Sequence, residues 1–276
     1  MRADLHMHTN ASDGQYSPAE LVELARKFDV IAITDHDTTE GVEPAQGAAK
    51  PYGAPLVIPG VELSAEDEAG DVHVLGYYID IHNAALQAKL THFRETRFAR
   101  GKLIVEKLAA MGLPLDWDRV VAIAGGGAIG RPHIARAMLE AGYVETVKDA
   151  FSRYISNEGP AYVARARLTP EEAVALIHAA GGAAVLAHPG LLPDYRAMIL
   201  RLIAVGLDGV EVNHPANSET VRLDLRGIAI ASSLVMTGGS DFHGPAIKPD
   251  NTLGMISPPE GAVDALQVAA KRYAAT

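Results

Sequence analysis

Two histidines one residue apart, His6 and His8, are the residues of this sequence best placed to do chemistry. The alternation of small or apolar with polar residues predicts a β-strand over Ala3–His8. Alternate side chains of a strand share a face, so Asp4, His6 and His8 point the same way. Two imidazoles on one face supply half of a metal site, and a carboxylate behind them is a candidate to orient a ring.

Histidines and carboxylates recur at the ends of later apolar segments. The carboxyl ends of barrel strands meet at one rim, so these groups are expected to gather there. The chain has no cysteine, so a metal would be held by imidazole and carboxylate. Such donors suit Mn²⁺, Zn²⁺ or Fe²⁺ and do not choose among them. The recurring groups are Asp35-His36-Asp37, Glu62, His73, His188, Asn213-His214 and Asp241-Phe242-His243.

Short apolar segments alternate with amphipathic helical patterns, which predicts an α/β fold with a parallel sheet closed into a barrel. Pro18 and Pro170 each follow a Ser or Thr that can cap a helix. About seven strands are countable, one short of a regular eight-stranded barrel. The expected strands are Ala3–His8, Val30–Thr34, Leu56–Ile58, Val72–Tyr78, Ala183–Ala187, Gly209–Val212 and Leu234–Thr237. The expected helices are Pro18–Phe28, Pro170–Ala180, Tyr195–Ala204, Ser218–Ala231 and Gly261–Ala274.

The alternation breaks off between residues 83 and 167. That stretch shows no strand pattern and predicts helices over Ala84–Met111, Leu115–Ala124, His133–Glu140 and Thr146–Tyr154, with a hinge at Gly125-Gly126-Gly127. We therefore expect a barrel formed by residues 1–82 and 168–276, interrupted by a helical insertion over residues 83–167.

Composition sets outer bounds on function. The chain has 276 residues, is 48% hydrophobic and carries a formal charge of −10, which argues against broad binding to nucleic acid. No apolar run approaches the ~18 residues that span a bilayer, and the N-terminus does not resemble a signal peptide. The absence of cysteine fits a cytoplasmic protein. No obligate protein partner is evident.

Six motifs, in order along the whole chain, resemble the PHP (polymerase and histidinol phosphatase) family. The resemblance implies a distorted (β/α)7 TIM-like barrel with two or three divalent metal ions. One ion would be held by His6, His8, Glu62 and Asp241, a second by Glu62, His73 and His188, and a third by Asp13, His36 and His243. The motifs are DLHMHT with Ser12-Asp13-Gly14, then TDHD at 34–37, PGVE at 59–62, VHVLG at 72–76, AHP at 187–189 and GSDFH at 239–243.

A pair of divalent ions suits hydrolysis of a phosphoester by metal-activated hydroxide. Glu62, Asp241 and His243 are the expected catalytic side chains. Asp241 and His243 are alternative sources of a proton for the departing oxygen, which a metal ion can also stabilise.

The insertion contains a second resemblance, in Gly130-Arg131-Pro132-His133. This segment is similar to the Arg-x-His segment of PHP members that act on nucleoside 3′,5′-bisphosphates or trim short RNAs from the 5′ end. The resemblance implies an insertion that covers the barrel mouth, with Arg131 and His133 on the substrate phosphate. A helix N-terminus and a guanidinium both suit a phosphate. Further candidates are His214 as a residue lining the substrate pocket, and Lys248, Arg165 and Arg167 for phosphate contacts.

Other interpretations stay open for several of these residues. Asp13 could simply cap the turn at Gly14, and Asp35 and Asp37 are expected as loop caps or second partners of ligands. The basic run Arg94, Arg97, Arg100 and Lys102 is typical of a solvated helix face. His82, His92 and His178 show no partner pattern.

Three other activities compete with a nucleotide phosphatase. Histidinol phosphate phosphatases share the metal ligands, whereas a regulatory PHP module would bind metal without catalysis. Amidohydrolases also use His-x-His but usually carry a bridging lysine, a position better filled here by Glu62. The segment at 130–133 favours a nucleoside 3′,5′-bisphosphate as the small-molecule substrate, with short RNA as the alternative.

Overall fold

The protein is described by a computed structural model that covers all residues except 68–69, 126–128, 164–167 and 275–276. Seven strands form one sheet in sequence order, from β1 to β7. In the described part of the chain, no helix is both long and apolar enough to span a membrane. The strands are β1 (Ala3–Asp4), β2 (Val30–Ile33), β3 (Leu56–Asp67), β4 (Gly70–Tyr77), β5 (Ala183–Leu186), β6 (Gly209–Asn213) and β7 (Val235–Gly238).

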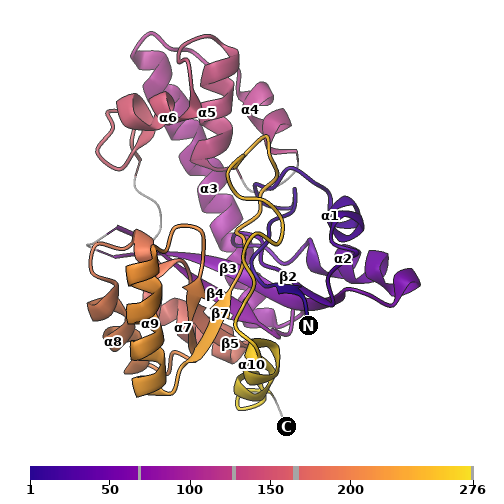
Figure 1. Ribbon diagram of the computed structural model, residues 1–276. Coiled ribbons are helices and arrows are strands. Elements are labelled where there is room, and N and C mark those ends of the chain that lie inside the picture. Colours follow the sequence, from indigo (N-terminus) through magenta and orange to yellow (C-terminus); the bar gives the residue numbers. More distant parts are fainter. Residues whose placement is uncertain (68–69, 126–128, 164–167, 275–276) are drawn as a thin grey trace.

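The sheet is nearly closed into a barrel with helices around it (Figure 1). Beyond the ends of β1 and β7, Met7 and Phe242 form an isolated parallel bridge, and the N–H of His8 donates to the carbonyl of Phe242 at 3.0 Å. The expected seven-stranded α/β barrel is confirmed.

One expectation about the sheet is wrong, because it is not entirely parallel. Strand β4 runs antiparallel to both β3 and β5. The sequence predicted only Leu56–Ile58 for β3, since Pro59-Gly60 looked like a break. Pro59 instead pairs with Ile33. Gly60 passes so close to its neighbours that a Cβ atom would lie 2.9 Å from the carbonyl oxygen of Gly76.

The barrel helices follow the predicted pattern closely. They are α1 (Pro18–Leu24), α7 (Pro170–Ala179), α8 (Tyr195–Ile203), α9 (Glu219–Ser232) and α10 (Ala262–Ala270). The hydroxyls of Ser17 and Thr169 accept from the N–H of the third residue of α1 and α7, Glu20 and Glu172, which confirms the predicted caps. The sequence did not predict α2 (Val42–Ala49) or the short 3₁₀ helices Lys50–Tyr52 and Pro189–Leu191.

The described residues between Asn83 and Val163 contain helices and no strand, as predicted. Gly126 and Gly127 of the expected hinge lie outside the described residues, and Gly125 ends α4 with φ +60°. The helices are α3 (Ala84–Ala110), α4 (Trp117–Ala124), α5 (Arg131–Glu140), α6 (Val147–Ala150) and a π-helical turn, η2 (Phe151–Ile155).

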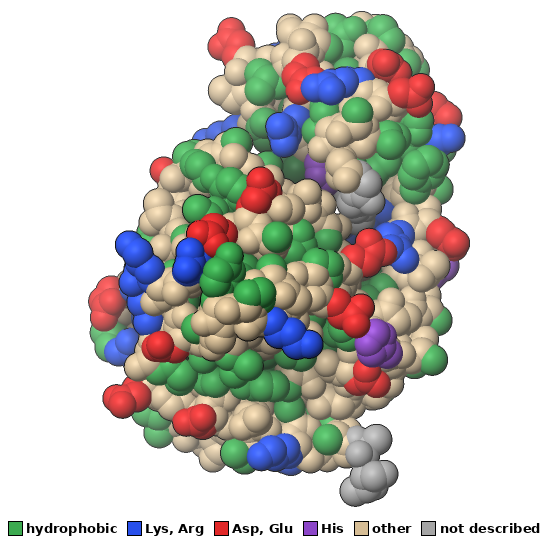
Figure 2. Space-filling model, turned by 90° about the vertical axis from the view of Figure 1, so that its right-hand side faces the viewer, with side chains coloured by type: hydrophobic (Ala, Val, Ile, Leu, Met, Phe, Trp, Pro, Cys, Tyr) green, Lys and Arg blue, Asp and Glu red, His purple; other side chains and the backbone are tan. Residues whose placement is uncertain are grey.

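Helix α3 belongs to two hydrophobic cores. Its first half buries Leu86 and Leu90 against the barrel core. Its second half buries Ile104 and Leu108 in a separate core shared with α4, α5 and α6. Each such buried side chain contributes about 1.5–3 kcal/mol relative to an exposed one. Around this second core the insertion helices form a smaller lobe above the barrel, labelled in Figure 1 and seen as the upper part of the molecule in Figure 2.

Candidate metal centre

The two histidines of the first segment point at one carboxylate. His6 and His8 are almost fully buried just beyond β1, and the Nε2 atom of each lies 3.1 Å from Oε2 of Glu62. Asp4 does not join them. Its carboxylate accepts from the hydroxyl of Ser240 at 2.6 Å and from the N–H of Gly254 at 3.0 Å, so it anchors the segment after β7.

Glu62 is the hub of the cluster. His73 faces it from the antiparallel strand β4, with Nδ1 2.9 Å from Oε1 of Glu62. His188, just beyond β5, places Nε2 3.0 Å from the same oxygen. His36 completes the group, with Nδ1 3.3 Å from Oε2. Burial raises the pKa of Glu62, but His36, His6 and His73 outweigh it and hold the pKa well below its usual range.

A second group forms on the other side of His8. Ligand atoms of His8, Asp13, His36 and His243 all lie within 4.8 Å of one another. The tight turn behind Asp13 requires Gly14, because a Cβ atom there would lie 2.3 Å from the carbonyl oxygen of His8.

Asp35 holds the loop that carries Asp13. Its buried carboxylate accepts from the N–H and the hydroxyl of Thr9 and from the hydroxyl of Ser12. Asp37 accepts from the N–H of Ser64 at 2.8 Å and pairs with Arg97. Both aspartates therefore fix neighbours of the cluster, in keeping with the expectation for them.

Asp241 contributes its two oxygens to different neighbours. Oδ1 lies 3.4 Å from Nε2 of His8 and 3.3 Å from Nδ1 of His243. Oδ2 lies 2.6 Å from Nζ of Lys248 and 3.5 Å from Nε2 of His214. Lys248 and His214, both expected near substrate, thus contact Asp241 in this structure.

Glu211 is a residue of the site that sequence reasoning missed. It is fully buried in β6, where it accepts from Nδ1 of His6 at 3.0 Å and from the backbone N–H of His188 at 2.7 Å. An ionised carboxylate only accepts, so Nδ1 carries the proton and a neutral His6 keeps its lone pair on Nε2. The available signal was an acid inside the apolar strand sequence GVEV.

The donor spacing fits divalent metal ions. At metal–ligand distances of about 2.1 Å, neighbouring donors of a tetrahedral site lie about 3.4 Å apart. The contacts of 3.1–3.6 Å that join His6 and His8 to Glu62 and Asp241 are close to this value. Both ring nitrogens of His8, Oδ1 of Asp13 and Nδ1 of His36 are also buried without a hydrogen-bond partner. Such orphaned atoms, in a set of imidazoles and carboxylates, are what a cation would satisfy.

Two residues of the cluster have a strained backbone. His188 and Asp241 have φ of +30° and +51°, a region that residues other than glycine rarely adopt. Each such residue costs about 1–3 kcal/mol, and the cost persists only where the surroundings impose it. Both strained residues present side chains to Glu62 or His8.

The pKa values of the histidines in the cluster are shifted in opposite directions. Burial lowers the pKa of His8, but the adjacent carboxylates of Asp241 and Glu62 outweigh it and raise the pKa to about 9. Burial lowers the pKa of His36 well below its usual range and also lowers that of His188. A metal ion binding at His8 below pH 9 would therefore have to displace a proton, whereas His36 and His188 already offer lone pairs.

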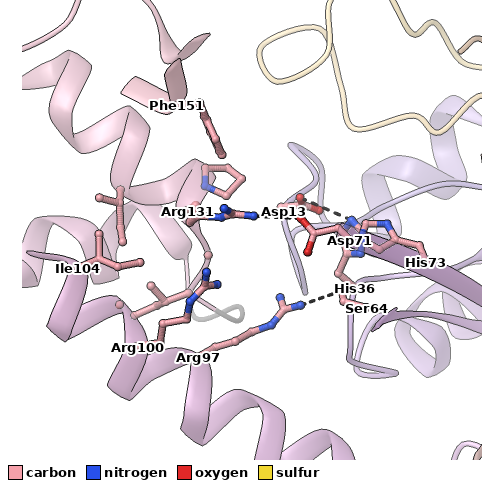
Figure 3. Close-up of a pocket in the computed structure, with 15 residues that line it drawn as sticks. Asp13, His36, Ser64, Asp71, His73, Arg97, Arg100, Ile104, Arg131 and Phe151 are labelled. Carbon is pink, nitrogen blue, oxygen red and sulfur yellow. Dashed lines mark hydrogen bonds and ion pairs between the residues drawn. The ribbon is translucent and has the colours of Figure 1, made fainter. Parts of the chain in front are cut away.

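A cavity of about 190 Å³ lies between this cluster and the insertion. Asp13, His36 and His73 line one side, and Arg97, Arg100 and Arg131 reach in from α3 and α5 on the other (Figure 3). The basic run on α3 was interpreted as a solvated face, which is wrong for two of its members. Arg97 and Arg100 line the cavity because they share the inward face of α3 with Gly101 and Ile104.

Arg131 and His133 have partners at the N-terminus of α5. Arg131 donates to Oδ1 of Asn157 at 2.6 Å and to Oδ2 of Asp71 at 3.2 Å. His133 is buried, and its Nδ1 accepts from the N–H of Gly130 at 3.0 Å. Burial lowers the pKa of His133, so the neutral ring carries its proton on Nε2.

The other candidates lie elsewhere. Arg165 and Arg167 fall outside the described residues. His82 approaches Glu43 at the surface, His92 lies beside Phe93, and His178 binds Asp208 at 2.9 Å.

Comparisons with known proteins agree on one family. The sequence profile of the PHP domain matches residues 4–163. The 5′-3′ exoribonuclease Rnm of Salmonella typhimurium is 39% identical over 249 residues, which cover 88% of this chain and 85% of that protein. A 3′,5′-nucleoside bisphosphate phosphatase of Chromobacterium violaceum is 35% identical over 252 residues, covering 88% of this chain and 87% of that protein.

A solved structure gives the same result. A protein from Bifidobacterium adolescentis, assigned as a metal-dependent phosphoesterase, superposes with a TM-score of 0.88 at 36% identity. The match covers 97% of this chain and 96% of that one. Since the family profile spans more than half of the sequence and relatives above 30% identity cover most of it, the chain belongs to the PHP domain family.

Proposed function

We propose that the protein is a metal-dependent phosphoesterase that removes the 3′-phosphate of nucleoside 3′,5′-bisphosphates, giving a nucleoside 5′-monophosphate and phosphate. One observation carries the proposal. A single cavity has imidazole and carboxylate donors on one side and three arginines on the other. A substrate with two phosphates matches both sides, because the donors can hold cations for the reacting phosphate and the arginines can bind the second.

We assign the metal ligands in three sets. His6, His8, Glu62 and Asp241 would hold one ion, and Glu62, His73 and His188 a second. Asp13, His36 and His243 would hold a third. When bound, Mn²⁺, Zn²⁺ or Fe²⁺ ions would stabilise charge on the phosphoryl oxygens and lower the pKa of the attacking water.

The protein's own residues prepare this site. Glu211 keeps Nε2 of His6 available by accepting the proton-bearing Nδ1. Burial raises the pKa of Asp241, but Lys248 and His6 outweigh it and hold the pKa well below its usual range. Asp241 therefore stays ionised at neutral pH, which suits a ligand better than a proton donor. As the P–O3′ bond breaks, the departing oxygen would need direct charge stabilisation or a proton from His243.

The insertion would select the substrate. We propose that the helices of residues 83–167 cover the barrel mouth and that Arg131 and His133 bind the second phosphate. The guanidinium has five N–H donors, so its contacts with Asp71, Asn157 and the carbonyl of Ile155 leave capacity for a phosphate oxygen. Nε2–H of His133 would add a further donor.

A second candidate is 5′-3′ hydrolysis of short RNA. The 39% identity to a 5′-3′ exoribonuclease favours it. The positions of Arg97 and Arg100, which follow one another along α3 on the side facing the cavity, favour it as well. Histidinol phosphate is a weaker candidate, because its single phosphate would bind at the metal donors and leave the three cavity arginines without a phosphate to bind.

The test measures phosphate release by metal-loaded protein from adenosine 3′,5′-bisphosphate, histidinol phosphate and p-nitrophenyl phosphate, with a simple amide as the control for an amidohydrolase. We expect the bisphosphate to give the highest kcat/KM and the amide to give none. His188→Ala and Asp241→Ala should abolish turnover without changing the far-UV circular dichroism. Phosphate release from none of the esters would instead favour a PHP module without catalysis.

A further inference from the structure

Lys248 contacts the cluster through Asp241 but belongs to none of the three proposed ligand sets. It lies in the segment between β7 and α10, which climbs to the same end of the barrel as the insertion (Figure 1). Its ammonium lies 2.6 Å from Oδ2 of Asp241. The other oxygen of that carboxylate, Oδ1, faces His6, His8 and His243 at 3.6, 3.4 and 3.3 Å.

A turn in the backbone before Lys248 brings its side chain back to Asp241. The N–H of Lys248 donates to the carbonyl of Gly244 at 2.9 Å, which closes a turn. Gly244 has φ +91° and packs so closely on Gln15 that a Cβ atom would lie 2.5 Å from it. Asn251 donates through Nδ2 to the carbonyl of Asp241 at 3.3 Å. The loop is thus held by Gln15 at one end and by Asp241 at the other.

Charge gives Lys248 a distinct place in the cluster. Asp13, Glu62, Glu211 and Asp241 face mainly imidazoles, which must be neutral to bind metal. Among the described residues, Lys248 is the lysine or arginine whose side chain contacts one of these four carboxylates.

We propose that Lys248 is a positioning residue for the metal centre. By holding Oδ2, it turns Asp241 so that Oδ1 alone faces the nitrogens of His6, His8 and His243. Without Lys248, Oδ2 would keep only the longer contact with Nε2 of His214, at 3.5 Å, and the carboxylate could rotate about its last bond or bind with both oxygens. The inference rests on the proposed metal site, and it assigns to Lys248 a contact with Asp241 in place of one with substrate phosphate.

The experiment compares Lys248→Met, Lys248→Arg and the control Lys271→Met. The control removes the same charge at the C-terminal end of α10. Manganese binding to metal-stripped protein is measured by calorimetry, and kcat and KM for adenosine 3′,5′-bisphosphate are measured at saturating manganese. Thermal unfolding of each variant establishes that it is folded.

We expect Lys248→Met to weaken manganese binding about 10- to 100-fold, the range found when partners of metal ligands are removed. KM at saturating manganese should stay within about twofold, and Lys248→Arg should recover most of the binding. Unchanged manganese binding in folded Lys248→Met would overturn the inference. A tenfold rise in KM with intact metal binding would do the same, because it assigns Lys248 to the phosphate.

The readouts separate this inference from the proposed function. If wild-type protein binds manganese but releases phosphate from no ester, the proposed function fails, while the calorimetry still decides the role of Lys248. If wild-type protein binds no manganese, the inference is wrong as well.

Discussion

Replacing Arg131 with alanine tests whether the insertion recognises a second phosphate. Arg131 begins α5, its side chain is 16% exposed, and it lines the cavity opposite Asp13 and His73. Its partners are two neutral acceptors and a carboxylate that is 40% exposed, so losing them should change the free energy of unfolding by only about 0–1 kcal/mol. A binding defect would therefore not reflect misfolding.

The magnitude follows from the contact that would be lost. A hydrogen bond to a charged group contributes about 1.5–3 kcal/mol, and 1.4 kcal/mol corresponds to a tenfold change in an equilibrium constant. Arg131→Ala should thus raise KM for adenosine 3′,5′-bisphosphate about 10- to 150-fold. A contact with the non-reacting phosphate is equally present in the ground and transition states, so kcat should change little.

The assay uses a substrate pair that differs in the second phosphate. Phosphate release from adenosine 3′,5′-bisphosphate and from p-nitrophenyl phosphate is measured for wild type, Arg131→Ala, Arg131→Lys and Arg119→Ala. Arg119 lies in the same lobe but pairs with Glu140 at the surface, so its loss should affect neither substrate. Lysine keeps the charge without the planar pair of donors and should recover only part of the effect.

Two results would refute this reasoning. An equal loss of kcat/KM on both substrates would place Arg131 at the reacting phosphate or in the fold. An unchanged KM for the bisphosphate would remove Arg131 from substrate binding altogether.

Three further predictions concern the cluster and the barrel. Glu211→Gln keeps the shape but offers Nδ1 of His6 a weaker acceptor, so manganese affinity in calorimetry should fall about 10- to 100-fold; wild-type affinity would contradict this role. The folded-state pKa of His8, about 9, lies above its ordinary value of 6.5, so its contribution to stability is present below pH 6.5 and is lost as pH rises through 9. The Tm of metal-free wild type should fall across that window relative to His8→Gln, and parallel curves would contradict the assignment. Leu75→Ala should lower the free energy of unfolding in urea by about 2–5 kcal/mol, because Leu75 is fully buried in β4. A loss below about 1 kcal/mol would contradict this and would mean that neighbouring side chains fill the space left by Leu75.

Much of the candidate metal-binding cluster could be predicted because strand geometry is local. Side chains two residues apart share a face, and the ends of barrel strands share a rim, so the sequence predicts that His6, His8 and His188 lie at one rim. The capped starts of α1 and α7 are equally local, since Ser17 and Thr169 reach N–H groups within one turn.

The hairpin of β3 and β4 could not be predicted in this way. Pro59-Gly60 is typical of a break, yet β3 continues through it to Asp67, because β2 and β4 lie on either side and supply the pairing. Strand β4 runs antiparallel to β3, and this pairing brings His73 beside Glu62. Strand direction depends on neighbours distant in sequence, which local pattern does not encode.

The sequence by itself determined the chemistry of this protein: the donor types, their order along the chain, and the strand and helix periodicity that sends them to one rim. Only the tertiary structure decided which atoms meet. It placed Glu211 behind His6, Lys248 on Asp241, and Arg97 and Arg100 inside a cavity instead of on a solvated face. The reason is that burial and charge pairing are properties of several segments packed together, and no single segment specifies what will lie against it.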